Sequence, residues 1–272
     1  MTEFLKQQNA HPRDQNIVFH ERGHKYQILT DMKSYYTSVT TWIHTLFPKF
    51  DADAVIEKMK KGRNWNPENK YWGKTNQEIK DEWNNNGKQV SQLGTTLHAY
   101  IEDFMNTEMN KQEYTQKDIL ETNNHQHPEI EWSLFEKFVE DFPTLMPYRS
   151  EWMVYDEEIK IAGSIDMIYK NEDGSVSIYD WKRCKDIIYD TEWNDMASNK
   201  CIKHLPNTNF WHYSLQLNMY KYILEKKYNV AVKDLFLVRL HPENKDNKYE
   251  LHKVPVLVKE MEDLLNERRK TD

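Results

Sequence analysis

The sequence predicts an α/β or α+β layered protein, because its apolar residues change their spacing along the chain. In the first half most apolar residues recur with the spacing of helices. In the second half they alternate with polar residues, which predicts three consecutive strands at 151–155, 160–169 and 175–181. A long helix (209–228) and a further strand (234–240) follow. This order favours a layered core preceded by a helical N-terminal part.

The first half is expected to contain one hairpin and several helices. The hairpin is predicted over 16–30, around Arg22 and Gly23. The first helix after it begins at Ser38, a good N-cap, and is closed by Pro48. Loop-like stretches are expected at 62–74 and, in part, at 113–128. The predicted helices of this half are 38–47, 51–61, 75–86, 89–106 and 129–142; a strand at 249–257 and a helix at 260–270 are predicted near the C-terminus.

The composition is that of a globular chain whose core is rich in aromatic side chains. Of 272 residues, 38% are hydrophobic and 13% aromatic, and only 7 are Gly and 9 Pro. These values argue against a repetitive or disordered chain. Because no linker divides the sequence, we expect a single domain over 1–272. Within it, 1–90 form an N-terminal elaboration, 91–257 the core and 258–272 a C-terminal helix.

We expect no membrane span, no targeting segment and no cysteine framework. No apolar run approaches the 18 or so residues that a bilayer requires. The first ten residues lack both an apolar signal core and an excess of arginine. Cys184 and Cys201 are too few for a disulfide framework or a four-cysteine iron–sulfur cluster. A reducing, intracellular compartment is therefore the expectation.

The net charge of −7 is the main objection to a protein that binds nucleic acid, because such binding depends on neutralising phosphates. Metal-binding carboxylates add negative charge, however, and a basic groove can coexist with an acidic remainder. Three short basic stretches offer such a groove, or are simply solvated faces: 58–63, 182–185 and 268–270.

The most informative feature is the pair of strands that carries Asp166, Asp180 and Lys182. Side chains alternate along a strand, so Asp180 and Lys182 share one face while Trp181 points to the other. Two carboxylates and an ammonium are thus brought to the ends of two apolar strands. Hydrolysis of a phosphodiester with a divalent metal needs this set, because carboxylates bind Mg²⁺ or Mn²⁺ and a cation assists the attacking water.

A simpler interpretation of the same pattern is a hairpin with a surface ion pair. The chain is 30% charged, and Glu158 and Lys160 show the same acid-x-lysine spacing. The flanks of the two aspartates argue against an exposed pair, because Asp166 lies between Ile165 and Met167 and Asp180 lies next to Trp181. Charges in such strands are costly unless they are paired or bound to a metal.

The helix predicted over 89–106 places His98 and Glu102 on one face, four residues apart. His98 would lie at the border of the apolar stripe. One interpretation is a structural histidine hydrogen-bonded to Glu102. The other is a metal ligand, with Glu102 behind it or as a further ligand.

Two other positions are candidates for the site. Gln216 and Tyr220 are four residues apart on the long helix, on a face different from its buried stripe. They are ordinary surface residues, or an amide and a phenol that hold the DNA backbone or support Lys182. Glu151 lies on the strand before Asp166, where it is an edge charge or approaches the site.

Taken in order, these motifs resemble the PD-(D/E)XK nuclease superfamily, and within it the RecB-type exonuclease branch. The set comprises Gly94 with His98, the run Gly163 to Asp166, the run Asp180 to Lys182, and Gln216 with Tyr220. The run Ser38 to Thr41 also resembles the opening segment of mitochondrial genome maintenance exonucleases and their viral and phage relatives. The likeness covers about 38–240. It implies a restriction-endonuclease-like core with a mixed central sheet flanked by helices.

The resemblance also implies roles for individual residues. His98, Asp166 and Asp180 correspond to metal ligands for Mg²⁺ or Mn²⁺, with the backbone carbonyl of Trp181 as a further ligand. Lys182 corresponds to the lysine that orients the water. Less securely, the resemblance adds Glu151 and Glu102 to the metal site, and Gln216, Tyr220 and Arg183 to the DNA-binding residues. The chain departs from some relatives in lacking the four-cysteine cluster, and Arg183 replaces their Thr or Ser.

The expected activity is therefore that of a metal-dependent DNA exonuclease acting on DNA ends or single strands in replication, repair or recombination. Aromatic residues of the N-terminal part, including Trp65, Tyr71 and Trp72, either stack unpaired bases or anchor a loop. An endonuclease of the same fold, a non-catalytic nucleic-acid-binding module and a structural protein with chance carboxylates are the alternatives.

Overall fold

A mixed six-stranded sheet forms the centre of the computed structural model, which describes residues 3–123, 127–191 and 195–270. Its strands run in the order β3-β5-β6-β7-β8, and β4 pairs with the other edge of β5. The strands are β3 (Thr37–Ser38), β4 (Met146–Asp156), β5 (Ile161–Lys170), β6 (Val176–Lys182), β7 (Val232–Arg239) and β8 (Glu250–Lys253). A separate hairpin pairs β1 (Ile17–His20) with β2 (Lys25–Ile28), as predicted.

The three consecutive strands predicted from the alternating pattern form an antiparallel meander. β4 pairs with β5 along its length, and β5 pairs with β6 through a tight turn in which Gly174 has φ +82°. Only glycine adopts that conformation without strain. β3 joins β5, and β7 joins β6, in parallel. The sheet is therefore mixed, which confirms the predicted fold class.

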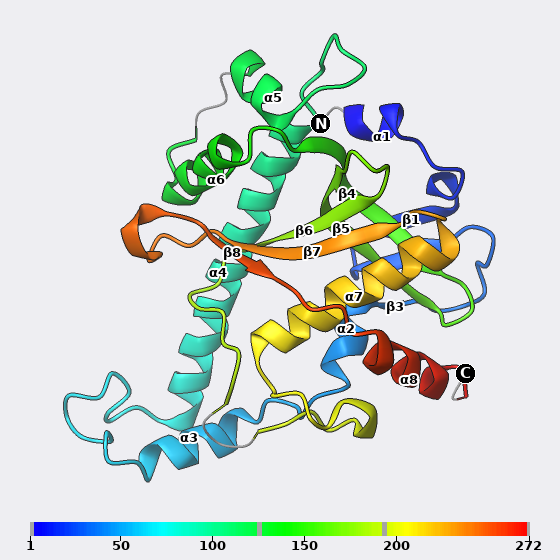
Figure 1. Cartoon of the computed structure of the whole chain (residues 1–272). Helices are drawn as coiled ribbons and strands as arrows, with labels where there is room; N and C mark the ends of the chain where they lie inside the picture. Colours follow the sequence, from blue (N-terminus) through cyan, green and yellow to red (C-terminus); the bar gives the residue numbers. More distant parts are fainter. Residues whose placement is uncertain (1–2, 124–126, 192–194, 271–272) are drawn as a thin grey trace. The chain divides into compact units, whose positions relative to one another are not determined.

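Helices cover both faces of the sheet (Figure 1). One face packs against α2 (Val39–His44), α7 (Asn209–Lys227) and α8 (Val258–Arg268), around apolar residues such as Ile178 and Leu235. The opposite face packs against α6 (Ile130–Asp141), α5 (Gln116–Thr122) and the C-terminal end of α4 (Asn76–Met105), around Tyr179 and Trp181. The remaining helices are α1 (Phe4–Gln8) and α3 (Ala52–Lys60). Two apolar cores thus sandwich the sheet.

The separation of residues 75–86 and 89–106 into two helices was wrong, because α4 is continuous from Asn76 to Met105. Thr75 and Glu78 form the reciprocal hydrogen bonds of a capping box at its start. The asparagines before Gly87, and Gly87 itself, each lower helix stability by only about 1 kcal/mol or less. A break would require the helix to nucleate again, which is costlier than continuing it.

Two smaller differences concern segments near the sheet. β4 begins at Met146, five residues earlier than predicted, and a register shift between Pro147 and Arg149 marks an irregularity in it. The segment predicted as partly loop contains α5, whose Thr115 and Asp118 form a second capping box. The Thr-x-x-Asp spacing at its start was the signal for this helix.

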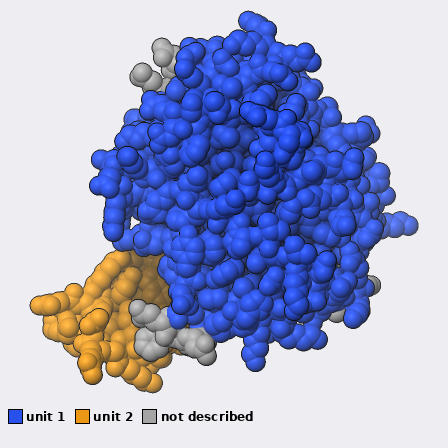
Figure 2. Space-filling view, in the orientation of Figure 1, with its two compact units in different colours: residues 1–48, 97–272 blue, residues 49–96 orange. Residues whose placement is uncertain are grey.

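The chain divides into two compact units, which Figure 2 colours separately. Unit 1 comprises 1–48 and 97–272 and contains the six-stranded sheet; unit 2 comprises 49–96. The expectation of one domain, with boundaries at 90 and 257, stays a prediction. Within the residues that the structure describes, no helix combines the length and apolar character needed to cross a bilayer.

Candidate functional site

The candidate site lies where β5 and β6 separate. The two strands pair only through 167–170 and 176–179, so the ladder ends just before Asp166 on one strand and Asp180 on the other. Beyond this point the backbone N–H of Trp181 donates to the Asp166 carboxylate at 2.9 Å. A side chain thus satisfies a backbone donor that the ladder leaves free.

Alternation along β6 places the charged residues and the tryptophan on opposite faces, as predicted. Trp181 packs its ring between Phe135 and Phe138 of α6, at centroid distances of 5.5 and 5.4 Å. On the other face, Lys182 Nζ lies 2.5 Å from Asp180 Oδ2 and 4.5 Å from the centre of the Tyr213 ring. Asp180 is only 2% exposed, so this is a buried pair and not the surface ion pair of the simpler interpretation.

His98 reaches the site from the last two turns of α4. Its Nε2 lies 3.0 Å from the Trp181 carbonyl oxygen, and its Nδ1 lies 3.6 Å from both Glu151 Oε1 and Asp166 Oδ2. The ring nitrogens therefore face three other groups, not Glu102. Burial disfavours the charged ring, but Asp166 and Glu151 outweigh it and raise the pKa of His98 to about 9.

Glu151 joins this cluster through an unusual backbone conformation. Its φ is +42°, in the left-handed region that non-glycine residues seldom adopt. Ser164, two residues before Asp166 on β5, donates a hydrogen bond of 2.9 Å to its carboxylate. Strained backbone of this kind concentrates at functional sites, because the surrounding structure must hold it in place.

The ligand atoms of His98, Glu151 and Asp166 all lie within 4.8 Å of one another. An imidazole and two carboxylates form a donor set suited to a transition-metal cation such as Mn²⁺, and the carboxylates suit Mg²⁺. The three side chains are partly exposed, so an ion in solution has access to them. The donor set therefore fits the metal site that the sequence predicts, with Glu151 in a more central position than expected.

The electrostatics of the site favour the arrival of a cation. Burial, and then the neighbouring carboxylates, raise the pKa of Asp166 and of Asp180, whereas Lys182 and His98 oppose this shift. Burial disfavours the charged amine of Lys182, but Asp180 and Asp166 outweigh it and raise its pKa. Buried anions close to each other are unfavourable, and a divalent cation would offset their repulsion.

Three residues on one face of α7 lie against the site. Gln216 Nε2 donates to Asp180 Oδ1 at 3.4 Å, and Tyr213 lies one turn earlier, beside Lys182. Tyr220 packs on Gly163 of β5, so closely that a Cβ at this glycine would lie 2.8 Å from the tyrosine ring. Gln216 and Tyr220 are 8% and 3% exposed. They therefore lie beneath the carboxylates and not on an open helix surface.

Two of the predicted residues make other contacts. Arg183 Nε donates to Glu131 Oε1 of α6 at 2.6 Å, and both side chains are largely buried. Glu102 is outside the three-residue cluster and lines a small cavity with Glu151. Burial, and then the Glu151 charge, raise the pKa of Glu102.

The sequence interpretation assigned no role to Ser164 or Tyr213, although Ser164 belongs to the run Gly163 to Asp166. Each could have been found by periodicity, because Ser164 is two residues from Asp166 on a strand and Tyr213 is three residues from Gln216 on a helix. Their side chains contact the site from the same faces as those neighbours.

Comparison with known proteins gives one clear result. Curated proteins provide no match to the chain. The sequence profile of the PD-(D/E)XK nuclease superfamily matches residues 70–271, which include the whole candidate site. The mixed sheet flanked by helices is consistent with the restriction-endonuclease-like fold of that family. The chain belongs to the PD-(D/E)XK nuclease superfamily.

Proposed function

We propose that this nuclease is a divalent-metal-dependent DNA exonuclease of the RecB-type branch, acting on DNA ends or single strands in replication, repair or recombination. The observation that carries the metal-dependent chemistry is the convergence of His98, Glu151 and Asp166 next to the buried pair of Asp180 and Lys182. Superfamily membership supports hydrolysis of a nucleic acid. The choice of DNA and of exonucleolytic cleavage follows from the resemblance of the motifs.

In this proposal His98, Glu151, Asp166 and Asp180, with the carbonyl oxygen of Trp181, hold one or two Mg²⁺ or Mn²⁺ ions. The ion supplies Lewis-acid stabilisation of the scissile phosphate and makes water more acidic. The residues around it keep the ligands in place: Trp181 N–H on Asp166, Ser164 on Glu151, and Gln216 on Asp180. Such support holds a site in one geometry before the substrate arrives.

Lys182 is the catalytic cation of the proposal. Asp180 and Asp166 keep its amine protonated, and the Tyr213 ring lies beneath it. A charged amine fixed beside the ligands orients the attacking water and stabilises the negative charge that develops on the phosphate. Asp180 thus has two roles, because it holds the metal and positions the lysine.

Linear and circular single-stranded DNA of the same sequence, incubated with Mg²⁺ or Mn²⁺, test the proposal. We expect the linear strand to be degraded and the circle to survive, with no cleavage of either in EDTA. Cleavage of the circle would make the protein an endonuclease. No turnover of either substrate, with binding intact, would make it a non-catalytic binding module. Lys182→Ala is the control for a contaminating nuclease, and strands labelled at one end or the other give the polarity.

A further inference from the structure

Unit 2 (orange in Figure 2) carries an exposed tryptophan, Trp72, beside a half-buried one, Trp65, and no part of the mechanism uses either. The Trp65 and Trp72 rings lie 5.6 Å apart at an angle of 50°, and Trp72 is 46% exposed. Both belong to the segment 61–75 between α3 and α4, which we call the tryptophan loop. One exposed aromatic side chain is common on a protein surface, so a binding site is indicated only by the neighbours of Trp72.

Two other aromatic residues of unit 2, Tyr71 and Trp83, have a structural role. Trp83 donates its indole N–H to the Tyr71 hydroxyl at 2.9 Å, and the two rings meet edge to face. Tyr71 and Trp83 thereby attach the tryptophan loop to α4. No such hydrogen bond involves the indole N–H of Trp65 or Trp72 among the residues that the structure describes. Tyr71 and Trp83 therefore anchor the loop, whereas the exposed ring of Trp72 is available to bind a ligand.

Polar contacts hold the tryptophan loop in one conformation. Asn69 donates from its side chain to the Asn64 carbonyl at 2.9 Å and accepts the Tyr71 N–H at 2.9 Å. The backbone N–H of Trp65 closes a turn onto the Gly62 carbonyl at 3.1 Å. Because the loop is ordered in advance, stacking on it costs little conformational entropy.

Cationic residues lie in the tryptophan loop and directly before it. Lys60 Nζ lies 5.9 Å from the centre of the Trp65 ring. Lys61 and Arg63 are exposed, and within the described parts of the chain neither takes part in an ion pair. Unit 2 has nine lysines and arginines against seven aspartates and glutamates, a net charge of +2 in a chain of net charge −7. The positive charge points to a polyanion as the occupant.

We propose that Trp72, supported by Trp65, is a stacking platform for the bases of single-stranded nucleic acid, and that Lys61 and Arg63 bind its phosphates. Aromatic rings with a cationic border bind unpaired strands in this way, since every base offers a flat face. Duplex ends and interiors offer few such faces. The inference rests on the proposed function, because it names the substrate class, an unpaired strand.

Fluorescence anisotropy of a labelled oligothymidylate with the full chain, in EDTA, tests the platform. We expect Trp72→Ala to weaken binding about tenfold, the usual effect of one lost stack, and Trp72→Phe to weaken it less. For a strand of the same length made of abasic residues, Trp72→Ala should have no effect. The proposal would be overturned if Trp72→Ala lowered the affinity for both strands equally, or for neither. It would also be overturned if a duplex of equal length bound as tightly as the single strand.

Lys61→Gln and Arg63→Gln should weaken binding of both strands and lower the salt dependence, by about 0.7 in the slope of log affinity against log salt for each lost phosphate contact. Tyr35→Ala and Lys33→Gln are matched controls, because both residues are exposed but lie in unit 1. They should leave affinity unchanged, and a loss equal to that of the loop variants would overturn the assignment.

EDTA separates this test from that of the proposed function, since binding is measured without cleavage. If the single strand binds to the platform but no metal ion supports cleavage, the nuclease proposal is wrong and the platform proposal still holds. If the protein cleaves DNA but Trp72→Ala binds the single strand with normal affinity, the platform proposal is wrong and the nuclease proposal still holds. Circular dichroism of each variant checks that unit 2 keeps its helices.

Discussion

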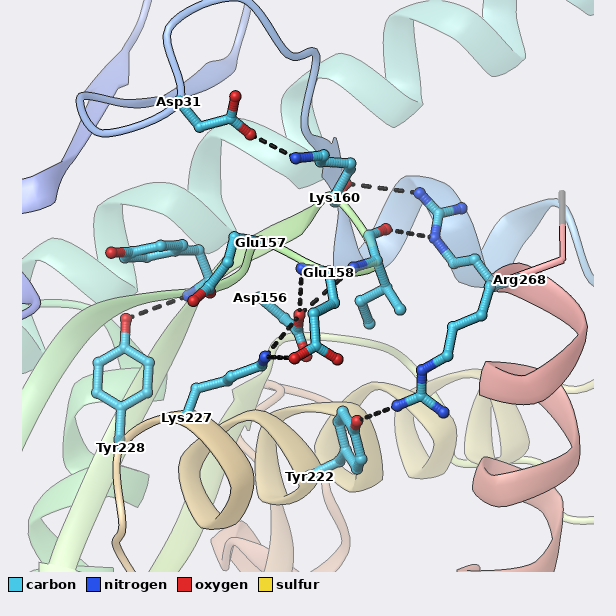
Figure 3. A network of polar contacts seen from close by, with 12 residues as sticks. Asp31, Asp156, Glu157, Glu158, Lys160, Tyr222, Lys227, Tyr228 and Arg268 are labelled. Atoms are coloured by element: carbon cyan, nitrogen blue, oxygen red, sulfur yellow. Dashed lines mark hydrogen bonds and ion pairs between the residues drawn. The ribbon is translucent and has the colours of Figure 1, made fainter. Parts of the chain in front are cut away.

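Among the residues that the structure describes, two lysine–carboxylate pairs in different places differ in kind: one resembles a site for a ligand and the other does not. The first is the candidate metal centre, where Asp180 meets Lys182 beside His98, Glu151 and Asp166. The second is the turn between β4 and β5, where Asp156 lies 3.5 Å from Lys227 and is fully buried (Figure 3). Burial of charge alone therefore does not identify the functional site.

At the turn, the Asp156 carboxylate serves as a hydrogen-bond acceptor for the backbone. Asp156 Oδ1 accepts the N–H groups of Glu158 and Ile159, at 2.8 and 3.4 Å, and so closes the turn. Lys227 also pairs with Glu158 at 2.6 Å, and Arg268 donates to the Ile159 carbonyl (Figure 3). Each charge serves the connection between two strands, and the cluster contributes to the fold.

At the candidate metal centre the charges face one another. Two carboxylates and an imidazole converge on one point, and a strained residue, Glu151, supplies one of them. The structure keeps this arrangement although the carboxylates repel each other. Natural proteins retain such unfavourable clusters where function requires them. The comparison predicts opposite results for equivalent substitutions in the two places.

The largest expected difference is in activity. Asp166→Asn should lower cleavage of linear DNA about a thousandfold, equivalent to about 4 kcal/mol of transition-state stabilisation, without lowering Tm. Asp156→Asn should retain near wild-type cleavage. Initial rates and thermal melts of both variants give the measurement, and an active Asp166→Asn protein would remove this residue from the site.

Metal binding should distinguish the two clusters without any turnover. At Mn²⁺ concentrations about a hundred times its Kd, binding to the folded state adds about 2.7 kcal/mol of stability, which corresponds to a rise in Tm of several degrees. Asp156→Asn should show the same rise, and Asp166→Asn little or none. A rise of equal size in Asp166→Asn would place the ion elsewhere.

Stability should respond in the reverse order. Asp156→Ala removes the acceptor of two backbone N–H groups and should lower the free energy of unfolding by about 1–3 kcal/mol. Urea denaturation of this variant, with Glu140→Ala on the exposed side of α6 as a matched control, measures the loss. If Asp156→Ala is as stable as the wild type, the turn cluster is dispensable for folding.

The smallest expected effect is a pH dependence of stability at the turn. Burial raises the pKa of Asp156. The folded state therefore binds more protons than the unfolded state between the unfolded pKa, about 4, and the raised folded pKa. The contribution of this group is complete below that window and is lost as pH rises through it. Asp156→Asn should flatten the dependence of unfolding free energy on pH within this window. An unchanged slope would show that other groups cause the pH dependence.

Much of the fold and part of the candidate site follow from periodicity in the sequence. The alternation along 160–169 and 175–181 gives the antiparallel hairpin, and the same alternation places Asp180 and Lys182 opposite Trp181. A period of two leaves little freedom here, because a shift of one residue would move Asp180 and Lys182 to the face that packs on α6, and Trp181 to the face of the site. For His98 the helix pattern left a structural role and a metal-ligand role open, and only the family resemblance favoured the second.

Tertiary structure alone decided which groups meet. Glu151 enters the cluster because its φ is positive, which no local sequence pattern predicts. Arg183 is held by Glu131, a residue far away in sequence, and Gln216 contacts Asp180 because α7 packs on that face of the sheet. Local sequence determines which face a side chain occupies, whereas its partners depend on packing between distant segments.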